Sequence, residues 1–197
     1  MDKALKGLLQ QYSALDWVVD IVGVAAVVES FAVFFEQTGF RKYTVLYRMN
    51  RLKNLDEPQM LDKRVMYAHG EHVYQIHDLL ECYFDKYSER IPLVEEIEKW
   101  VNKNNVLVIT DQQNVIGFLI FEITGVTSYL RYWFTHPDGR DNKIGSALQR
   151  RFFHECRHTK RQLFWVINTN ENAIMRYKHY GFEAEQLYCQ VMIKHKQ

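Results

Sequence analysis

Hydrophobic and polar residues follow two periods from residue 63 onward, and these periods predict a regular succession of strands and helices. Apolar residues recur at every third or fourth position, as on one face of a helix, in residues 71–87, 93–101, 144–156 and 171–180. Short runs rich in aliphatic and aromatic residues predict strands at 63–69, 105–110, 115–123, 128–136, 162–168 and 182–193. The predicted order is β-α-α-β-β-β-α-β-α-β, which is typical of an α/β or α+β domain.

Turn residues mark several of the predicted boundaries. The polar sequence DQQN at 111–114 separates two strands and predicts a hairpin. Pro137 follows an aromatic strand directly, and Gly181 marks the end of the last helix.

The most apolar stretch of the chain is WVVDIVGVAAVVESFAVFF at 17–35. It is long enough to span a membrane, but Asp20 and Glu29 interrupt it, and a central carboxylate costs roughly 2.5–3.5 kcal/mol on insertion scales. A buried strand followed by a core helix explains these residues better, so neither a signal peptide nor a membrane partner is expected.

The composition adds limits to this picture. A chain of 197 residues suggests one domain, or one domain with a substantial appendage. The net charge of +1 predicts no nucleic-acid partner. The three cysteines, Cys82, Cys156 and Cys189, are far apart and odd in number, which favours a reducing, cytoplasmic setting.

A single stretch, HPDGRDNKIGSALQRRFFHECRH at 136–158, contains two candidate chemistries. In its first half a strand meets a Pro-Asp-Gly turn and then a helix, whose first unpaired N–H groups and dipole favour an anion. Gly145 and Ala147 are small enough to let a ligand approach the backbone, while Arg140 and Lys143 add positive charge. The alternative is an ordinary strand-to-helix connection.

The second half of the stretch, HECRH, fits the zinc-protease pattern HExxH, with His154 and His158 as ligands and Glu155 as general base. These histidines lie on a helix face that points away from the predicted core stripe, and the extended pattern HExxHxxGxxH fails. A solvated helix face is therefore the preferred interpretation, and no metal is expected.

Together with NENAIMRYKHYGF at 170–182, the first half of the stretch resembles the two cofactor motifs of the GNAT acyltransferase superfamily. The pattern Arg/Gln-x-x-Gly-x-Gly/Ala is read from Arg140 to Gly145, with Lys143 where the family usually has its first glycine. The pattern Asn-x-x-Ala-x-x-x-Tyr-x-x-x-Gly-Phe is met by Asn170, Ala173, Tyr177, Gly181 and Phe182. The resemblance covers about two-thirds of the chain and implies the family's mixed central sheet flanked by helices.

The resemblance also implies an acetyl-CoA (acyl-CoA) cosubstrate and a set of residues that bind it. These are Phe134, Thr135, Arg140, Asp141, Asn142, Lys143, Ile144, Gly145, Ser146 and Asn170. Tyr177 is then the general acid that protonates the leaving thiolate, with a core aromatic as the alternative role. Glu122 is the first candidate for the general base, followed by Glu95, Glu96 and the weaker His136, and a water chain is the alternative.

Residues 1–51 contain a second, shorter version of the C-terminal pattern. Gly39-Phe40 matches Gly181-Phe182, and Phe35 falls at the position of Tyr177. We therefore predict a truncated GNAT-like segment at 1–51, a linker at 52–62 and an acyltransferase domain at 63–197. The N-terminal segment lacks the phosphate turn, so we expect it to contribute structure without catalysis.

The leading functional hypothesis is an acyl-CoA-dependent N-acyltransferase that transfers acetyl to an amine by direct attack on the thioester. A non-catalytic acyl-CoA-binding or regulatory module is the alternative, and zinc hydrolysis through HECRH is a remote one. The expected partner is a small-molecule or peptide amine, with a homodimer left open.

Overall fold

The computed structural model describes residues 2–52 and 60–196 and divides into two compact units. Residues up to Met49 and those from Trp165 onward form one, the terminal unit, and Asn50–Phe164 form the other, the central unit. The predicted linker at 52–62 lies mostly outside the described residues. The predicted domain boundaries remain a prediction, whereas packing groups the C-terminal residues with the N-terminal segment.

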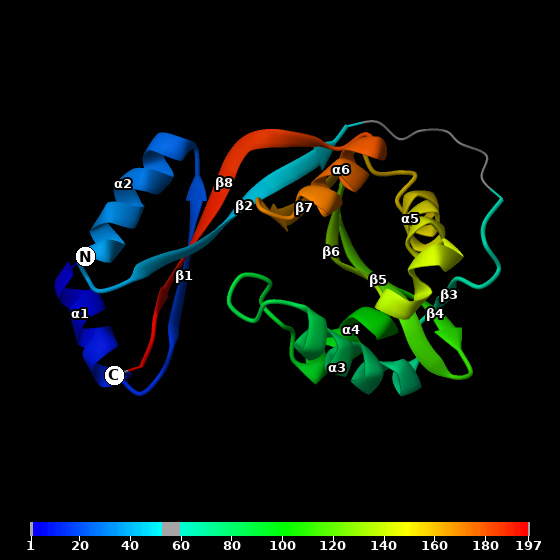
Figure 1. Cartoon of the computed structure of the whole chain (residues 1–197), viewed down its shortest axis with the longest axis horizontal. Coiled ribbons are helices and arrows are strands. Elements are labelled where there is room, and N and C mark those ends of the chain that lie inside the picture. The colour runs from blue at the N-terminus through cyan, green and yellow to red at the C-terminus, as the bar shows by residue number, and fades with distance from the viewer. Residues whose placement is uncertain (1, 53–59, 197) are drawn as a thin grey trace. The chain divides into compact units, whose positions relative to one another are not determined.

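The central unit is built on an antiparallel meander with one parallel neighbour (Figure 1). Its strands pair in the order β7-β6-β5-β4-β3, with β7 contributing its first residues, and β6 and β7 are parallel. The elements are β3 Met66–Tyr67, η1 Gly70–His72, α3 Val73–Tyr83, α4 Val94–Asn102, β4 Val106–Asp111, β5 Asn114–Thr124, β6 Thr127–Thr135, η2 Pro137–Asn142, α5 Ile144–Glu155 and β7 Arg161–Ile167.

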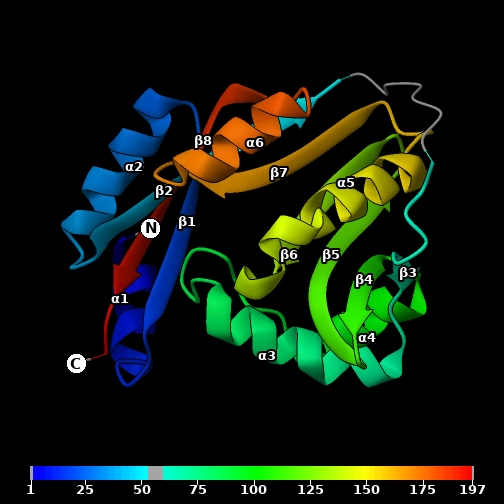
Figure 2. The same ribbon diagram turned by 45° about the vertical axis from the view of Figure 1, so that its right-hand side comes forward.

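Helices cover both faces of this sheet, as Figure 2 shows for α5 on one side and α3 with α4 on the other. Phe134 of β6 belongs to the core that α3 and α4 close. The next residue, Thr135, faces α5, because successive side chains of a strand point to opposite faces. Gly117 on β5 allows α5 to approach, since a Cβ there would come within 2.5 Å of Ile144 Cγ2.

The terminal unit is a second sheet region whose strands pair in the order β1-β8-β2-β7. Its remaining elements are α1 Asp2–Gln11, β1 Trp17–Gly23, α2 Ala25–Glu36, β2 Arg41–Arg51, α6 Glu171–His179 and β8 Glu183–Lys194. β1 runs antiparallel to β8 from Trp17↔Lys194 to Gly23↔Tyr188. The buried core lies among these elements and consists of Leu9, Ile21, Val28, Ala32, Phe40 and Met192.

The terminal unit contains two copies of one local structure, a helix that ends at a glycine followed by a phenylalanine. After α2, Gly39 has φ +89° and Phe40 N donates to Phe35 O at 3.1 Å. After α6, Gly181 has φ +82° and Phe182 N donates to Tyr177 O at 3.1 Å. In both copies the two rings meet edge to face, with centroids 5.3 Å and 6.1 Å apart.

The two copies exchange strands. β8 of the second copy lies between β1 and β2 of the first, and β2 pairs with β7, as the bond from Asn168 N to Val45 O shows. The N-terminal partial copy inferred from sequence remains a prediction, and β1 and β2 of this segment both pair with β8.

Residues 17–35 form β1 and most of α2, the strand and helix predicted for them. The expected burial is wrong for most of the stretch, because only Ile21, Val28 and Ala32 are buried, and apolar residues such as Val22 and Phe31 are exposed. Within the described residues, no helix has the length and apolar character needed to cross a membrane.

The three thiols should react unequally. Cys82 is exposed, whereas burial raises the pKa of Cys156 and of Cys189 to about 12. Because the thiolate is the reactive form, one fast equivalent is expected with a disulfide reagent at pH 8, and three in guanidinium. Cys82→Ser should remove the fast equivalent, and two fast equivalents in the native protein would contradict the buried assignments.

Candidate functional site

The end of β6 leads through a tight turn into the N-terminus of α5. Pro137–Asn142 form the short helix η2, Lys143 follows, and α5 begins at Ile144. Ala147 N donates to Lys143 O at 3.0 Å, which closes the first turn of α5. The amides of a first helical turn have no acceptor within their own helix, and the dipole there is positive. The turn therefore presents N–H donors suited to a phosphate or another anion.

Lys143 has φ 57° and ψ 22°, the left-handed conformation that favours glycine. The structure shows the glycine-like backbone carried by a lysine, whose exposed side chain adds a positive charge beside the turn.

Lys143→Gly should therefore separate backbone strain from charge. A left-handed non-glycine residue costs about 1 kcal/mol, part of which is offset by the greater freedom of glycine when unfolded. We expect the free energy of unfolding to rise by about 0.5 kcal/mol, while acetyl-CoA affinity falls a few-fold because a phosphate contact loses its charge. Lys143→Asn, which tolerates this φ, is the control for charge alone. Tighter binding by Lys143→Gly would show that the lysine is a defect.

Gly145 brings α5 close to β6. A Cβ at this position would lie 3.2 Å from Thr135 Oγ1 and 3.3 Å from Trp133 Cζ2. Ala147 is fully buried. The small residues of the turn thus serve helix packing, whereas ligand approach, the role that the sequence suggested, remains a prediction.

A second cation lies beside the turn and was missed by the sequence analysis. Arg64 Nη2 donates to Asn142 O at 3.2 Å, and its guanidinium also binds Asp62 at 2.7 Å. Hydrogen bonds from Arg64 lower the pKa of Asp62 to about 2. Arg64 is far from the turn in sequence, so no local pattern could have revealed it. Arg140 and Asp141 lie within η2, and Ser146 is half-buried in the first turn of α5.

The second half of β6 has one edge paired within the sheet. Its described pairing with β7 covers Thr127–Tyr129, whereas its pairing with β5 continues to Thr135. His136 N donates to Ile116 O across the β5 edge. Backbone N–H groups alternate in direction along a strand, so the Phe134 amide also points to β5. The amide of Thr135 points to the opposite edge of β6.

Phe134 itself lies in an aromatic group. Its ring centroid is 4.9 Å from that of Tyr83 and 5.3 Å from that of Phe118. The side chain of Phe134 is therefore part of the hydrophobic core between the sheet and helices α3 and α4.

Two further predicted residues, Asn170 and Tyr177, belong to the terminal unit. Asn170 Oδ1 accepts a hydrogen bond from Ala173 N at 3.2 Å and so caps α6. Tyr177 is half-buried, and the edge of its ring contacts Phe182.

The carboxylates considered as general base have other partners. Glu122 binds Arg131 Nε at 2.5 Å. Glu96 accepts from Leu93 N at 3.0 Å and so caps α4, whereas Glu95 is exposed. Each of the two paired carboxylates would have to give up its partner, or share it, to accept a proton from a substrate.

His136 has a different environment, at the end of β6. Its Nε2 lies 3.3 Å from the Tyr83 hydroxyl, and its Nδ1 lies 3.4 Å from the Asp138 carboxylate. The imidazole of His136 thus lies between a phenol and a carboxylate at the end of β6.

Glu89 is a carboxyl that the sequence analysis did not single out. Burial raises its pKa, although a backbone hydrogen bond from Asp85 N partly opposes this. Tyr132 fixes the loop by donating to Glu89 O at 3.0 Å and Arg90 O at 2.6 Å. No sequence pattern marked Glu89, because the burial of its carboxyl depends on the conformation of this loop.

The zinc-protease pattern does not form a helical pair. α5 ends at Glu155, so His158 lies beyond the helix that carries His154. Glu155 binds Arg151 Nε at 2.5 Å, and its pKa is lowered: burial raises it, but hydrogen bonds from Tyr67 and Arg151 outweigh that effect.

With this geometry in place, comparison with known proteins defines the class. The model of the Acetyltransferase (GNAT) family matches residues 73–182, and the chain belongs to this family. The resemblance inferred from its two motifs is confirmed, as is the fold class of a mixed sheet flanked by helices. No curated protein matches the chain in sequence.

Several solved structures share the fold at low sequence identity. A GCN5-related N-acetyltransferase from Sphaerobacter thermophilus is 14% identical with a TM-score of 0.68, over 100% of this chain and 65% of that one. The chain therefore spans less than two-thirds of that protein. A tandem GNAT protein from the clavulanic acid biosynthesis pathway, solved without AcCoA, is 10% identical with a TM-score of 0.67, over 98% and 68%. Ribosomal-protein-alanine N-acetyltransferase from Brucella melitensis is 18% identical with a TM-score of 0.50, over 66% and 98%.

Proposed function

We propose that the protein transfers an acetyl group from acetyl-CoA to an amine. The observation that carries this proposal is the turn from β6 through Lys143 into α5, which has the glycine-like backbone of an anion-binding turn in a chain of the GNAT family. The free cysteines fit a reducing compartment, and we propose the cytoplasm.

In the proposed reaction, acetyl-CoA is held at two points. Its pyrophosphate accepts hydrogen bonds from the first-turn amides of α5, with Lys143 and Arg64 supplying charge. Its pantetheine arm follows the edge of β6 opposite β5, where the Thr135 amide can donate to it. An amide that donates to the thioester carbonyl stabilises the oxyanion as it forms.

The chemical step is direct attack. The amine nitrogen forms a bond to the carbonyl carbon, and the C–S bond then breaks to release the CoA thiolate. We assign the protonation of this thiolate to Tyr177, the tyrosine of the family motif, and the proton lost by the amine goes to a base or to water. Glu122 remains the proposed base if its bond with Arg131 opens, and His136 is the better-placed alternative beside the end of β6.

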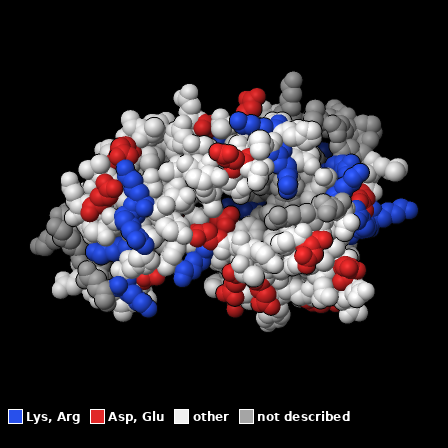
Figure 3. Space-filling view, viewed as in Figure 1, with Lys and Arg blue, Asp and Glu red and all other residues white. Residues whose placement is uncertain are grey.

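The surface charge of α3 and α4 supports a cationic acceptor. Exposed acidic residues on these helices are Asp78, Glu81, Glu95, Glu96 and Glu98, against one exposed lysine, Lys99. Figure 3 shows acidic side chains gathered over this part of the molecule. An acidic surface raises the local concentration of protonated amines, an effect that salt weakens.

The test is release of CoA thiol from acetyl-CoA across a panel of small amines, polyamines and peptides with free N-termini. Acetyl transfer to at least one amine, confirmed by the mass of the product, is the expected result. Acetyl-CoA binding without turnover on any acceptor would instead support the alternative, a non-catalytic acyl-CoA-binding module. The hydrogen bonds that already engage Glu122 and Glu96 favour that alternative, because they leave neither carboxylate ready to act as a base. Absence of binding would defeat both.

Gly145→Glu should abolish acetyl-CoA binding, with a loss of affinity of at least about 100-fold. The new carboxylate would stand at the positive end of α5 and beside the edge of β6, where it would repel a pyrophosphate and occupy its space. Calorimetry with acetyl-CoA measures the effect. Gly145→Ala is the matched control, because it tests the tight contact with Trp133 without adding charge. Unchanged affinity in a folded Gly145→Glu protein would remove the turn from the proposed site.

A further inference from the structure

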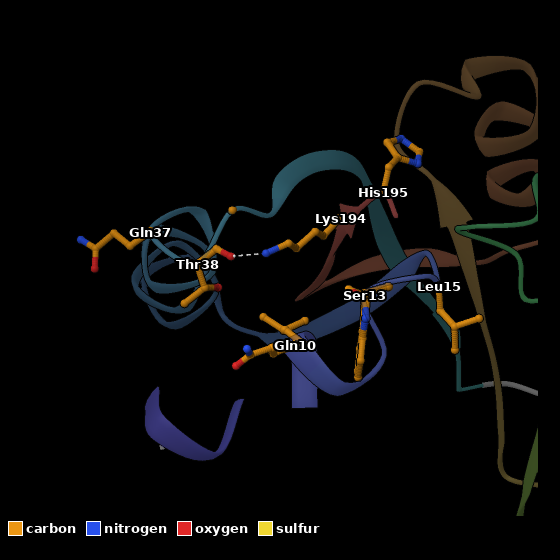
Figure 4. A pocket seen from close by; sticks show the side chains of 10 residues that line it. Gln10, Ser13, Leu15, Gln37, Thr38, Lys194 and His195 are labelled. Carbon is orange, nitrogen blue, oxygen red and sulfur yellow. Dashed lines mark hydrogen bonds between the residues drawn. The ribbon is translucent and has the colours of Figure 1, made fainter. Parts of the chain in front are cut away.

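The terminal unit contains a pocket of about 520 Å³, a volume within the range of small-molecule sites. It lies among α1, the turn that follows it, the end of α2 and the end of β8 (Figure 4). Its lining residues are Leu9, Gln10, Ser13, Leu15, Trp17, Gln37, Thr38, Gly39, Lys194 and His195. None of them has a role in the proposed acyl transfer.

Lys194 supplies the charge of this pocket. It follows Met192 by two residues on β8, so its side chain lies on the same face of the sheet as the core. Its ammonium donates to Thr38 O at 2.9 Å, the contact drawn as a dashed line in Figure 4. An ammonium has three donors, so two of them stay available to a ligand. Among residues 2–52 and 60–196, no carboxylate forms an ion pair with Lys194.

Gly39 makes room for this lysine. It has φ +89°, and a Cβ on it would lie 3.1 Å from Lys194 Nζ. The glycine that ends α2 therefore also allows the ammonium to reach the wall of the pocket. A side chain at this position would displace the ammonium.

The side chains that line the pocket include no carboxylate, and the histidine beside Lys194 has partners of its own. His195 Nε2 lies 2.6 Å from Arg41 Nη2, and its Nδ1 lies 3.4 Å from Asp16 Oδ1. Arginine can only donate, so Nε2 accepts and Nδ1–H faces Asp16. Asp16 also accepts from Lys196 N at 2.9 Å. The acid next to the pocket is thus engaged, and the lining keeps a net positive charge.

The rest of the lining is mixed, with uncharged polar side chains from α1, the turn after it and the end of α2, and apolar side chains from Leu9, Leu15 and Trp17. Leu9 is buried, Trp17 is half-buried, and Leu15 is 57% exposed. Trp17 Nε1 donates to Tyr12 O at 3.2 Å, which helps to fix the indole in the lining. A single ammonium beside leucine and indole surfaces suits a ligand with one anionic end and an apolar body.

From this arrangement we infer that the terminal unit binds a small monocarboxylate with an aliphatic or aromatic body, separately from the acyl-CoA site. The carboxylate accepts from Lys194 Nζ, and the body lies against Leu9, Leu15 and Trp17. No bond is made or broken in this step.

Octanoate is the probe, added to the full chain and followed by calorimetry and by the Trp17 indole resonance in a nitrogen–proton spectrum, assigned with Trp17→Phe. We expect one saturable site that shifts this resonance. Octanamide and octylammonium have the same body without the negative charge, and we expect them to bind at least about tenfold more weakly. Equal affinity for octanoate and octanamide, or no saturable binding, would overturn the inference on the native protein alone.

Lys194→Gln should weaken octanoate binding by about tenfold or more. Lys196→Gln is the matched control, since it makes the same chemical change two residues away and outside the lining, and it should alter affinity less than about twofold. Saturation with acetyl-CoA should leave octanoate affinity unchanged. If acetyl-CoA competes with octanoate, octanoate occupies the acyl-CoA site and the second site is refuted, while the proposed transferase function stands.

Discussion

A chain that begins at Lys63 will aggregate or lose its cooperative unfolding transition. Deleting residues 1–62 removes both neighbours of β8, because this strand lies between β1 and β2. It also removes every residue of the terminal core except Met192. Burying a large apolar side chain contributes about 1.5–3 kcal/mol, so losing four of them is on the order of 10 kcal/mol, comparable with the whole stability of a domain.

Thermal unfolding followed by circular dichroism, with light scattering, measures this outcome. Residues 1–62 supplied as a separate polypeptide are the control, because they should restore the transition if strand pairing is the cause. A monomeric 63–197 chain as stable as the full protein would show that the N-terminal segment is a separable appendage.

Tyr177→Phe should lower kcat by about 10²–10⁴-fold while changing acetyl-CoA affinity little. General acid catalysis typically contributes a factor of that size. A phenol with a pKa near 10 holds its proton at neutral pH and can donate it to a thiolate whose thiol resembles cysteine, at roughly 8.5. The substitution removes only the hydroxyl, so the contact of the ring with Phe182 is retained.

Steady-state kinetics with the best acceptor, under conditions where chemistry limits the rate, give the answer. The loss should fall on kcat more than on KM, because the interaction matures in the transition state. Tyr180→Phe is the matched control on the same helix end and should keep most of the activity. A Tyr177→Phe variant with the same kcat as the unchanged protein would show that Tyr177 only lines the site and that water is the proton donor.

Local patterns predicted most of the secondary structure. The predicted helix at 144–156 is α5, the DQQN turn joins β4 to β5, and Gly181 ends α6 with φ +82°. Two boundaries differ. The strand expected at 63–69 is confined to Met66–Tyr67, where β4 offers a partner, and the helix expected at 71–87 ends at Tyr83. Phe84 is extended, and Asp85 accepts from Tyr87 N and Ser88 N instead of a helix continuing.

The candidate site was predictable only where it is contiguous in sequence. The turn from Arg140 to Ser146 carries its own motif, so its residues could be named. The direction of the Thr135 amide depends on the register with β5, and the approach of Arg64 to Asn142 depends on the tertiary fold. Neither leaves a local pattern. The internal repeat was visible as Gly-Phe pairs, but the exchange of strands between its copies was not.

This exchange has a consequence for synthesis on the ribosome. β1, α2 and β2 leave the exit tunnel before the central unit, yet β8, the strand that must separate β1 from β2, is made only after that unit. At about 5–20 residues per second, the apolar N-terminal segment waits roughly ten to thirty seconds for its partner. Direct pairing of β1 with β2 in that interval would fill the place of β8 and block the native order. The nascent chain should therefore depend on a chaperone that shields apolar segments, more than a chain with sequential strand pairing does.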